Sequence, residues 1–162
     1  SKSYKRSRYK FDDKAPYQDQ KILFGKIFHE LMAKIKYSYQ FDKEITAFRK
    51  ARPIKGINKE EIIDLAQKTI THPSLSRLFT TKNKVICEKE IFVNQSQIIR
   101  PDRIIMTELK SCIVLDYKTG EKKAKDIKQT GAYAHVLRKM GFTIEKALIV
   151  YFSPQIDVVE AT

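Results

Sequence analysis

The chain has 162 residues, the size of one ordinary domain. Hydrophobic residues make up 42% of it, which excludes a wholly disordered chain because they suffice for a buried core. Its 32 Lys and Arg against 19 Asp and Glu give a formal net charge of +13, which favours a polyanionic partner, either nucleic acid or an acidic membrane surface.

The cysteine content and the hydrophobic pattern restrict cofactors and location. Two cysteines, Cys87 and Cys112, are too few for a disulfide scaffold or an iron–sulfur cluster, so we expect a reducing compartment, the cytoplasm. No stretch reaches the roughly 18 apolar residues of a transmembrane helix, no membrane partner is expected, and no phosphate-binding-loop motif predicts an ATP site. The first residue is Ser rather than Met, from which we expect a piece cut from a longer protein.

In chain order, the first half predicts a basic arm and two helices. Residues 1–16 carry several Lys and Arg without a regular hydrophobic period, so we expect an arm or linker there and one folded domain over residues 17–162. Apolar residues recur every three or four positions over residues 20–39, which is typical of an amphipathic helix. A second helix is expected from a cap at Asn58 to a stop before His72.

The second half predicts strands, a helix and further strands. Three β-rich runs separated by short polar breaks predict an antiparallel meander, because such breaks are too short for a crossover. The following helix is expected to end at Gly141, before another strand. The fold class is therefore α/β, a mixed sheet with an antiparallel meander flanked by helices. The expected ranges are residues 84–93, 97–106 and 111–117 for the meander, 125–140 for the helix, and 146–152 and 155–159 for the last strands.

Two carboxylates and a lysine are expected to meet at one end of this sheet. Asp116 and Lys118 are two apart in a strand, so their side chains share a face, whereas Leu115 and Tyr117 point to the other face. Asp102 begins the neighbouring strand or lies within it. Two carboxylates can hold a hard divalent cation, which polarises a phosphodiester and lowers the pKa of bound water. The lysine can position the attacking hydroxide or stabilise the charge of the transition state.

In these residues the chain resembles the PD-(D/E)XK nuclease superfamily. The matching motifs are Pro101-Asp102, Asp116-Tyr117-Lys118, Gly25-x-x-x-His29 on an earlier helix and Gln129-x-x-x-Tyr133 on the helix after the lysine strand. They occur in the order of the RecB-like branch and are most similar to the C-terminal nuclease domain of AddA/RecB-type helicase–nucleases. The resemblance implies a restriction-endonuclease-like core, with residues 17–162 as a single RecB-like nuclease domain.

The resemblance also implies the roles of the site residues. His29, Asp102 and Asp116 would be ligands of Mg²⁺ or Mn²⁺, and the Tyr117 carbonyl would complete the protein part of the shell. A histidine ligand suits Mn²⁺ better, because Mg²⁺ prefers oxygen. Asp102, Asp116 and Lys118 would be the catalytic residues.

Four further residues have less definite roles. Gln129 and Tyr133 would contact DNA or brace the site, although one helix face packing on the sheet would produce the same pattern. Family members also carry a glutamate in the first strand of the meander. Glu88 and Glu90 both fit this place because they share strand parity, and an exposed strand edge is the alternative for either.

The implied function is metal-dependent hydrolysis of DNA phosphodiesters, as an exonuclease acting on single-stranded ends in double-strand break repair and recombination. A helicase motor would lie in the same full-length chain or in a partner subunit. Two alternatives stay open. The first is a DNA-binding clamp that has lost turnover, and the second is a stand-alone endonuclease of the same superfamily.

Overall fold

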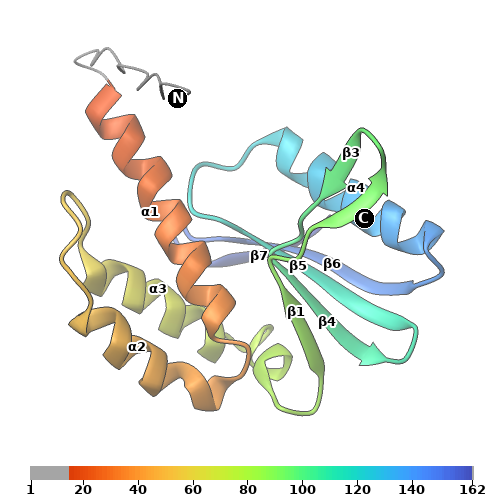
Figure 1. Ribbon diagram of the computed structural model, residues 1–162, viewed down its shortest axis with the longest axis horizontal. Helices are drawn as coiled ribbons and strands as arrows, with labels where there is room; N and C mark the ends of the chain where they lie inside the picture. Colours follow the sequence, from red (N-terminus) through yellow and green to blue (C-terminus); the bar gives the residue numbers. More distant parts are fainter. Residues whose placement is uncertain (1–14, 162) are drawn as a thin grey trace, which may run out of the picture.

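The computed structural model describes residues 15–161 and has helices on both faces of a sheet (Figure 1). The helices are α1 (Ala15–Lys34), α2 (Phe41–Lys50), α3 (Lys59–Thr71) and α4 (Ala124–Lys139), with 3-10 turns at Ser38–Gln40 and Ser76–Phe79. The strands are β1 (Lys84–Cys87), β2 (Ile91–Asn94), β3 (Gln97–Ile99), β4 (Arg103–Glu108), β5 (Ser111–Lys118), β6 (Thr143–Tyr151) and β7 (Asp157–Glu160).

The main sheet has five strands in the order β1-β4-β5-β6-β7. β5 and β6 are parallel, because α4 carries the chain across the sheet between them, and all other neighbours are antiparallel. β2 and β3 form a separate hairpin. The fold is therefore the expected mixed α/β sheet, consistent with a restriction-endonuclease-like core.

The side chains of β5 alternate between the two faces of the sheet, and both faces are buried. Ile113, Leu115 and Tyr117 pack in the core shared with α1, α2 and α3, whereas Cys112 and Val114 pack against α4. This period of two is the geometry of a strand that is covered on both sides. It places Asp116, on the parity of Cys112 and Val114, on the α4 face of the sheet.

The first helical region differs from the prediction in three ways. α1 begins at Ala15, inside the segment expected as an arm; the rest of that segment lies outside the described residues. The helix ends at Lys34 rather than near residue 39, because the Arg103 guanidinium binds the carbonyls of Ile35 and Lys36 and the chain turns there. α2 was not predicted at all, although Phe41, Ile45 and Phe48 recur at the helical period and pack on the core.

The meander is correct in its order but wrong in the extent of its strands. The first half of the first β-rich run (β1) and the second half of the second run (β4) are their outer ends. These two strands pair with each other, and β4 also pairs with β5. The first run breaks at Glu88, whose φ of 52° is left-handed, and the second breaks at Pro101, which has no N–H to donate. The inner ends become the β2–β3 hairpin.

The remaining elements agree with their predictions within a few residues. Asn58 caps α3 by accepting a hydrogen bond from the Glu60 N–H at 3.0 Å, and α3 ends before His72. α4 is followed by Gly141 at φ 96°, the left-handed residue expected after a helix. No helix within residues 15–161 is both long enough and apolar enough to cross a membrane.

Candidate active site

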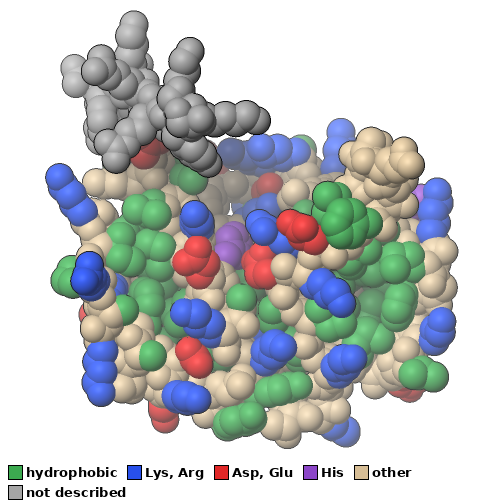
Figure 2. Space-filling view, viewed as in Figure 1, with side chains coloured by type: hydrophobic (Ala, Val, Ile, Leu, Met, Phe, Trp, Pro, Cys, Tyr) green, Lys and Arg blue, Asp and Glu red, His purple; other side chains and the backbone are tan. Residues whose placement is uncertain are grey.

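An open cleft of about 1320 Å³ is lined by seven of the predicted site residues. Its walls come from α1, from the β2–β3 hairpin, from the ends of β4 and β5, and from α4. Figure 2 shows acidic and basic side chains together with a histidine in the hollow between α1 and the hairpin. The predicted residues in its lining are His29, Glu88, Asp102, Asp116, Lys118, Gln129 and Tyr133.

Asp102 and Asp116 face each other across β4 and β5. The register pairs Arg103 with Leu115, so Asp102 lies opposite Asp116. The Asp102 N–H donates to Asp116 Oδ1 at 3.1 Å, and the Tyr117 N–H donates to Asp102 Oδ2 at 2.8 Å. Each carboxylate is thus held by the backbone of the opposite strand, and the two carboxylates lie together at one end of the sheet.

His29 reaches this pair from α1. Its Nε2 lies 2.9 Å from the Tyr117 carbonyl oxygen, to which it donates, and 3.2 Å from Asp102 Oδ2. Gly25, one turn earlier, allows the approach of the helix, because a Cβ there would lie only 2.8 Å from Thr119 Oγ1. The Tyr117 ring packs edge-on against Phe28 of α1 in the core, so the same two elements are also in contact below the site.

Lys118 lies on the same face of β5 as Asp116, as predicted. Its Nζ donates to Gln129 Oε1 on α4 at 2.8 Å, so the helix that follows the lysine strand orients the ammonium. Tyr133, one turn further along α4, also lines the cleft. Burial and the charges of Asp116 and Asp102 raise the pKa of Tyr133 to about 12, so its hydroxyl remains a donor.

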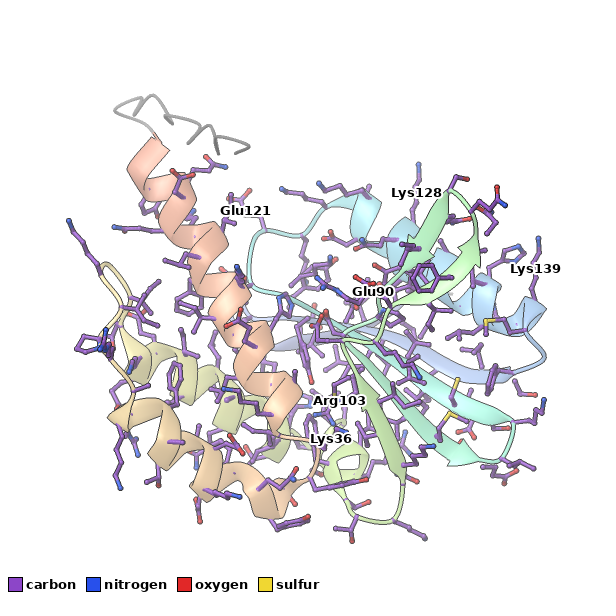
Figure 3. All side chains as sticks on the ribbon, in the orientation of Figure 1. Lys36, Glu90, Arg103, Glu121, Lys128 and Lys139 are labelled. Carbon is purple, nitrogen blue, oxygen red and sulfur yellow. The ribbon has the colours of Figure 1, made fainter. Side chains whose placement is uncertain are left out.

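The structure separates the two candidate glutamates. Among the described residues that line the cleft, Glu88 is present and Glu90 is not. Glu90 is exposed just before β2, at the base of the hairpin (Figure 3). The parity argument was wrong, because β1 ends at Cys87 and the left-handed Glu88 interrupts the strand.

The electrostatics of the carboxyl groups are unequal. Burial opposes ionisation of Asp102, but the hydrogen bond and charge of His29 outweigh it and hold the pKa below its ordinary value. Burial and the charge of Asp102 raise the pKa of Asp116 to about 7, and the same two causes raise that of Glu88 to about 7. Burial lowers the pKa of His29, but Asp102 overcompensates and the net shift is upward. Asp102 is therefore the fixed negative charge of the site.

The donor atoms fit a small divalent cation in part. Within residues 15–161, no group of three or more His, Cys, Asp or Glu side chains is already arranged to hold a metal ion. The Tyr117 carbonyl is the additional donor: His29 Nε2 lies 2.9 Å from it and 3.2 Å from Asp102 Oδ2. Adjacent ligands of an octahedral ion with bonds of about 2.1 Å lie about 3.0 Å apart. These spacings are therefore compatible with a shared metal once His29 Nε2 has lost its proton.

Two residues that support the site were not predicted. Thr130 on α4 is fully buried and its Oγ1 donates to Asp116 Oδ2 at 3.3 Å. Arg103, next to Asp102, is also fully buried and lies beside Lys36 at the end of α1 (Figure 3). Its guanidinium donates to the carbonyls of Met32, Ile35 and Lys36 and lies over the Phe79 ring. The available signal was weak: Arg103 directly precedes the apolar residues 104–106, within a run that predicts a strand.

Arg103 connects the end of α1 to β4. The carbonyls that it binds belong to the end of α1 and the residues just after it, where the helix dipole favours a positive charge. Because His29 lies on α1 and Asp102 precedes Arg103 directly, this contact sets the position of the histidine relative to the carboxylate.

Comparison with known proteins gives one match. A sequence model of the PD-(D/E)XK nuclease superfamily matches residues 4–160, nearly the whole chain. No curated protein and no solved structure matched in the other two comparisons.

Proposed function

The chain belongs to the PD-(D/E)XK nuclease superfamily, and on this basis we propose that it hydrolyses DNA phosphodiesters with Mg²⁺ or Mn²⁺ at the cleft between α1 and the end of β5. The observation that carries this proposal is the convergence of Asp102, Asp116 and Lys118 on one cleft. These are the groups that metal-assisted phosphodiester hydrolysis needs: two carboxylates and a fixed ammonium.

We assign the metal to four donors. Asp102 and Asp116 would supply carboxylate oxygens, His29 would supply Nε2, and Tyr117 its carbonyl oxygen. When bound, the metal polarises a phosphodiester and lowers the pKa of a water molecule. Glu88 lies at the same cleft and would accept hydrogen bonds from that water.

Lys118 supplies the positive charge next to the carboxylates. Gln129 accepts a hydrogen bond from its Nζ and so holds the ammonium at the wall of the cleft. Such a preoriented charge stabilises the negative charge that develops on the phosphate in the transition state. Tyr133, with a protonated hydroxyl, would donate a hydrogen bond to a phosphate oxygen.

Basic side chains around the cleft would bind the DNA backbone. Lys21 and Lys26 line it from α1, Arg100 from the end of the hairpin, and Lys123 from the start of α4. Contacts with phosphates supply affinity that does not depend on base sequence. We therefore propose cleavage with little sequence preference.

We further propose that this nuclease acts as an exonuclease on single-stranded ends during double-strand break repair and recombination. A helicase motor in the same full-length chain or in a partner subunit would deliver the strand. The support is the order of the motifs, from Gly25 and His29 to Gln129 and Tyr133, which resembles the RecB-like branch.

Cleavage of end-labelled linear DNA tests the proposal. Single- and double-stranded substrates are incubated with Mg²⁺, Mn²⁺ or EDTA, and wild type is compared with Lys118→Ala. The matched control is Lys139→Ala, at the opposite end of α4 (Figure 3). We expect metal-dependent cleavage that falls about 100-fold or more in Lys118→Ala and is unchanged in the control.

The products and the binding data separate the alternatives. Mononucleotides or a ladder that shortens from one end would support the exonuclease, whereas internal cuts would indicate the endonuclease. DNA binding without cleavage under either metal would contradict the nuclease and support the clamp. Titration calorimetry with Mn²⁺ tests the metal site separately: unchanged binding in Asp116→Ala would remove this residue from the shell.

A further inference from the structure

The β2–β3 hairpin exposes an apolar pair next to the catalytic cleft. Ile91 pairs with Ile99, and these two point to the core, where Ile99 is only 5% exposed. Phe92 pairs with Ile98, and since side chains alternate along a strand these two point to the opposite face. Phe92 is 71% exposed and Ile98 is 51% exposed.

The exposed face of the hairpin is the face that borders the site. Ile98 is part of the cleft lining, together with Asp102, Asp116 and Lys118. Phe92, directly opposite Ile98, extends the same apolar face beyond the rim. Figure 2 shows hydrophobic side chains beside the acidic and basic side chains of the hollow. Neighbouring apolar side chains that are exposed together at the edge of a cleft are typical of a binding surface.

The charges around this face indicate a nucleic acid. Lys89 precedes the hairpin, and Arg100, which also pairs with Glu88 at 3.3 Å, follows it; both are exposed. Lys21 and Lys26 lie on the α1 wall of the cleft. Formal net charge over the whole chain is +13. A nucleic acid whose phosphates contact these basic side chains can also place its bases on Phe92 and Ile98, provided that the faces of the bases are accessible.

Single strands and duplexes differ in this respect. A duplex presents phosphates and sugars and hides the faces of its bases, so the hairpin face would gain little from it. An unpaired base has a free π-face that stacks on an aromatic side chain. Ile22, 67% exposed on the α1 wall, adds a second apolar contact across the cleft.

We propose that the exposed face of the β2–β3 hairpin, formed by Phe92 and Ile98, stacks on unpaired bases and makes the cleft selective for single strands. This inference rests on the proposed function, since the strand that it holds is the one whose phosphate enters the site. It adds the surface that distinguishes single-stranded from double-stranded substrates.

A fluorescence experiment tests the contact directly. The chain contains no tryptophan, so Phe92→Trp places a single tryptophan on the proposed platform, which can be excited selectively over the tyrosines. We expect a short oligothymidylate to quench it and a duplex of equal length to leave it nearly unchanged. Leu109→Trp, at a side chain that is 90% exposed in the β4–β5 turn, is the matched control and should not respond. Quenching of both fluorophores, or of neither, would overturn the proposal.

Binding of labelled oligonucleotides by anisotropy in EDTA measures the selectivity without cleavage. Phe92→Ala should weaken single-strand binding about 5- to 30-fold and change duplex binding less than twofold, while Leu109→Ala changes neither. Equal losses for both DNAs, or no loss, would contradict the platform. A wild-type dimer in sedimentation that Phe92→Ala abolishes would instead assign the face to a second copy of the chain.

The outcome is separable from that of the proposed function. Selective single-strand binding through Phe92 without cleavage in Mg²⁺ or Mn²⁺ would retain the platform and reject the nuclease. Metal-dependent cleavage whose KM for single strands is unchanged in Phe92→Ala would retain the nuclease and reject the platform.

Discussion

The outer and inner ends of the two β-rich runs form different structures, one buried in the main sheet and the other exposed on one face. The outer ends, β1 and β4, pair in the main sheet, where Val85 is 3% exposed and Ile105 is fully buried. The inner ends, β2 and β3, form a hairpin on which Phe92 and Ile98 are 71% and 51% exposed. Similar apolar composition therefore serves the core in one region and a surface in the other.

The difference between the two regions begins at the site residues themselves. The Glu88 N–H donates to the Asp102 carbonyl at 3.1 Å, so the two breaks that end β1 and precede β4 lie side by side. One break carries a left-handed glutamate and the other the sequence Pro101-Asp102. The places where the strand pattern fails are thus those where carboxyl groups enter the cleft, which is where functional demands are expected to override local rules.

The largest difference in stability is expected when an isoleucine is replaced by alanine in each of the two regions. Ile105→Ala in β4 should lower the free energy of unfolding by about 2–5 kcal/mol, because the side chain is fully buried. Ile98→Ala in β3 should lower it by less than about 1 kcal/mol. Urea unfolding measures both. Similar losses for the two variants would mean that the hairpin is part of the core.

Two arginines provide the next comparison. Arg103→Met should cost about 2–4 kcal/mol, because buried carbonyls at the end of α1 lose their donor. Arg100→Met, on the hairpin side of the break, should cost about 1 kcal/mol or less, since the arginine of its 3.3 Å ion pair with Glu88 is 59% exposed. Thermal and urea unfolding check the pair. If the Arg103 variant were as stable as the Arg100 variant, the hydrogen bonds of Arg103 would not stabilise the packing of α1 on β4.

The raised pKa values of two carboxyl groups in the cleft predict how metal binding depends on pH. Asp116 and Glu88 have pKa values raised to about 7, mainly by burial, so a metal must displace protons below that pH. Affinity for Mn²⁺ should rise about tenfold or more from pH 6 to 8, as measured by calorimetry in buffers of different ionisation enthalpy. Release of no protons at pH 6 would contradict this.

The same shifts predict the stability of the metal-free protein. A carboxyl whose pKa is higher in the folded state binds its proton more tightly there. That contribution to stability is complete below the ordinary carboxyl pKa and is lost as pH rises through about 7. In EDTA, Asp116→Asn should show a weaker decline of melting temperature between pH 5 and 8 than wild type.

The smallest effect is expected at the residue that separates β1 from β2. Glu88 has φ 52°, which costs a residue with a Cβ more than it costs glycine. Glu88→Gly and Glu88→Ala both remove the carboxylate, but the glycine variant should be more stable by about 1 kcal/mol. An alanine variant of equal or greater stability would show that the left-handed backbone is not required.

The sequence by itself determined the features that depend on local geometry. Strand parity placed Asp116 and Lys118 on one face, helical spacing placed Gly25 and His29 on one flank, and Gly141 ended α4. Each follows from a backbone period or a cap, and those are properties of neighbouring residues. Each family motif spans only a few neighbouring residues, which is why the site residues and their order could be predicted from the sequence.

Only the tertiary structure decided the rest. It chose Glu88 over Glu90 for the cleft, paired Thr130 with Asp116, and brought Arg103 to carbonyls 67 to 71 positions earlier in the chain. It also exposed Phe92 and Ile98 on one face of the β2–β3 hairpin. Local periodicity cannot encode these outcomes, because each depends on which distant element covers a given face, and that is settled when helices and sheet pack together.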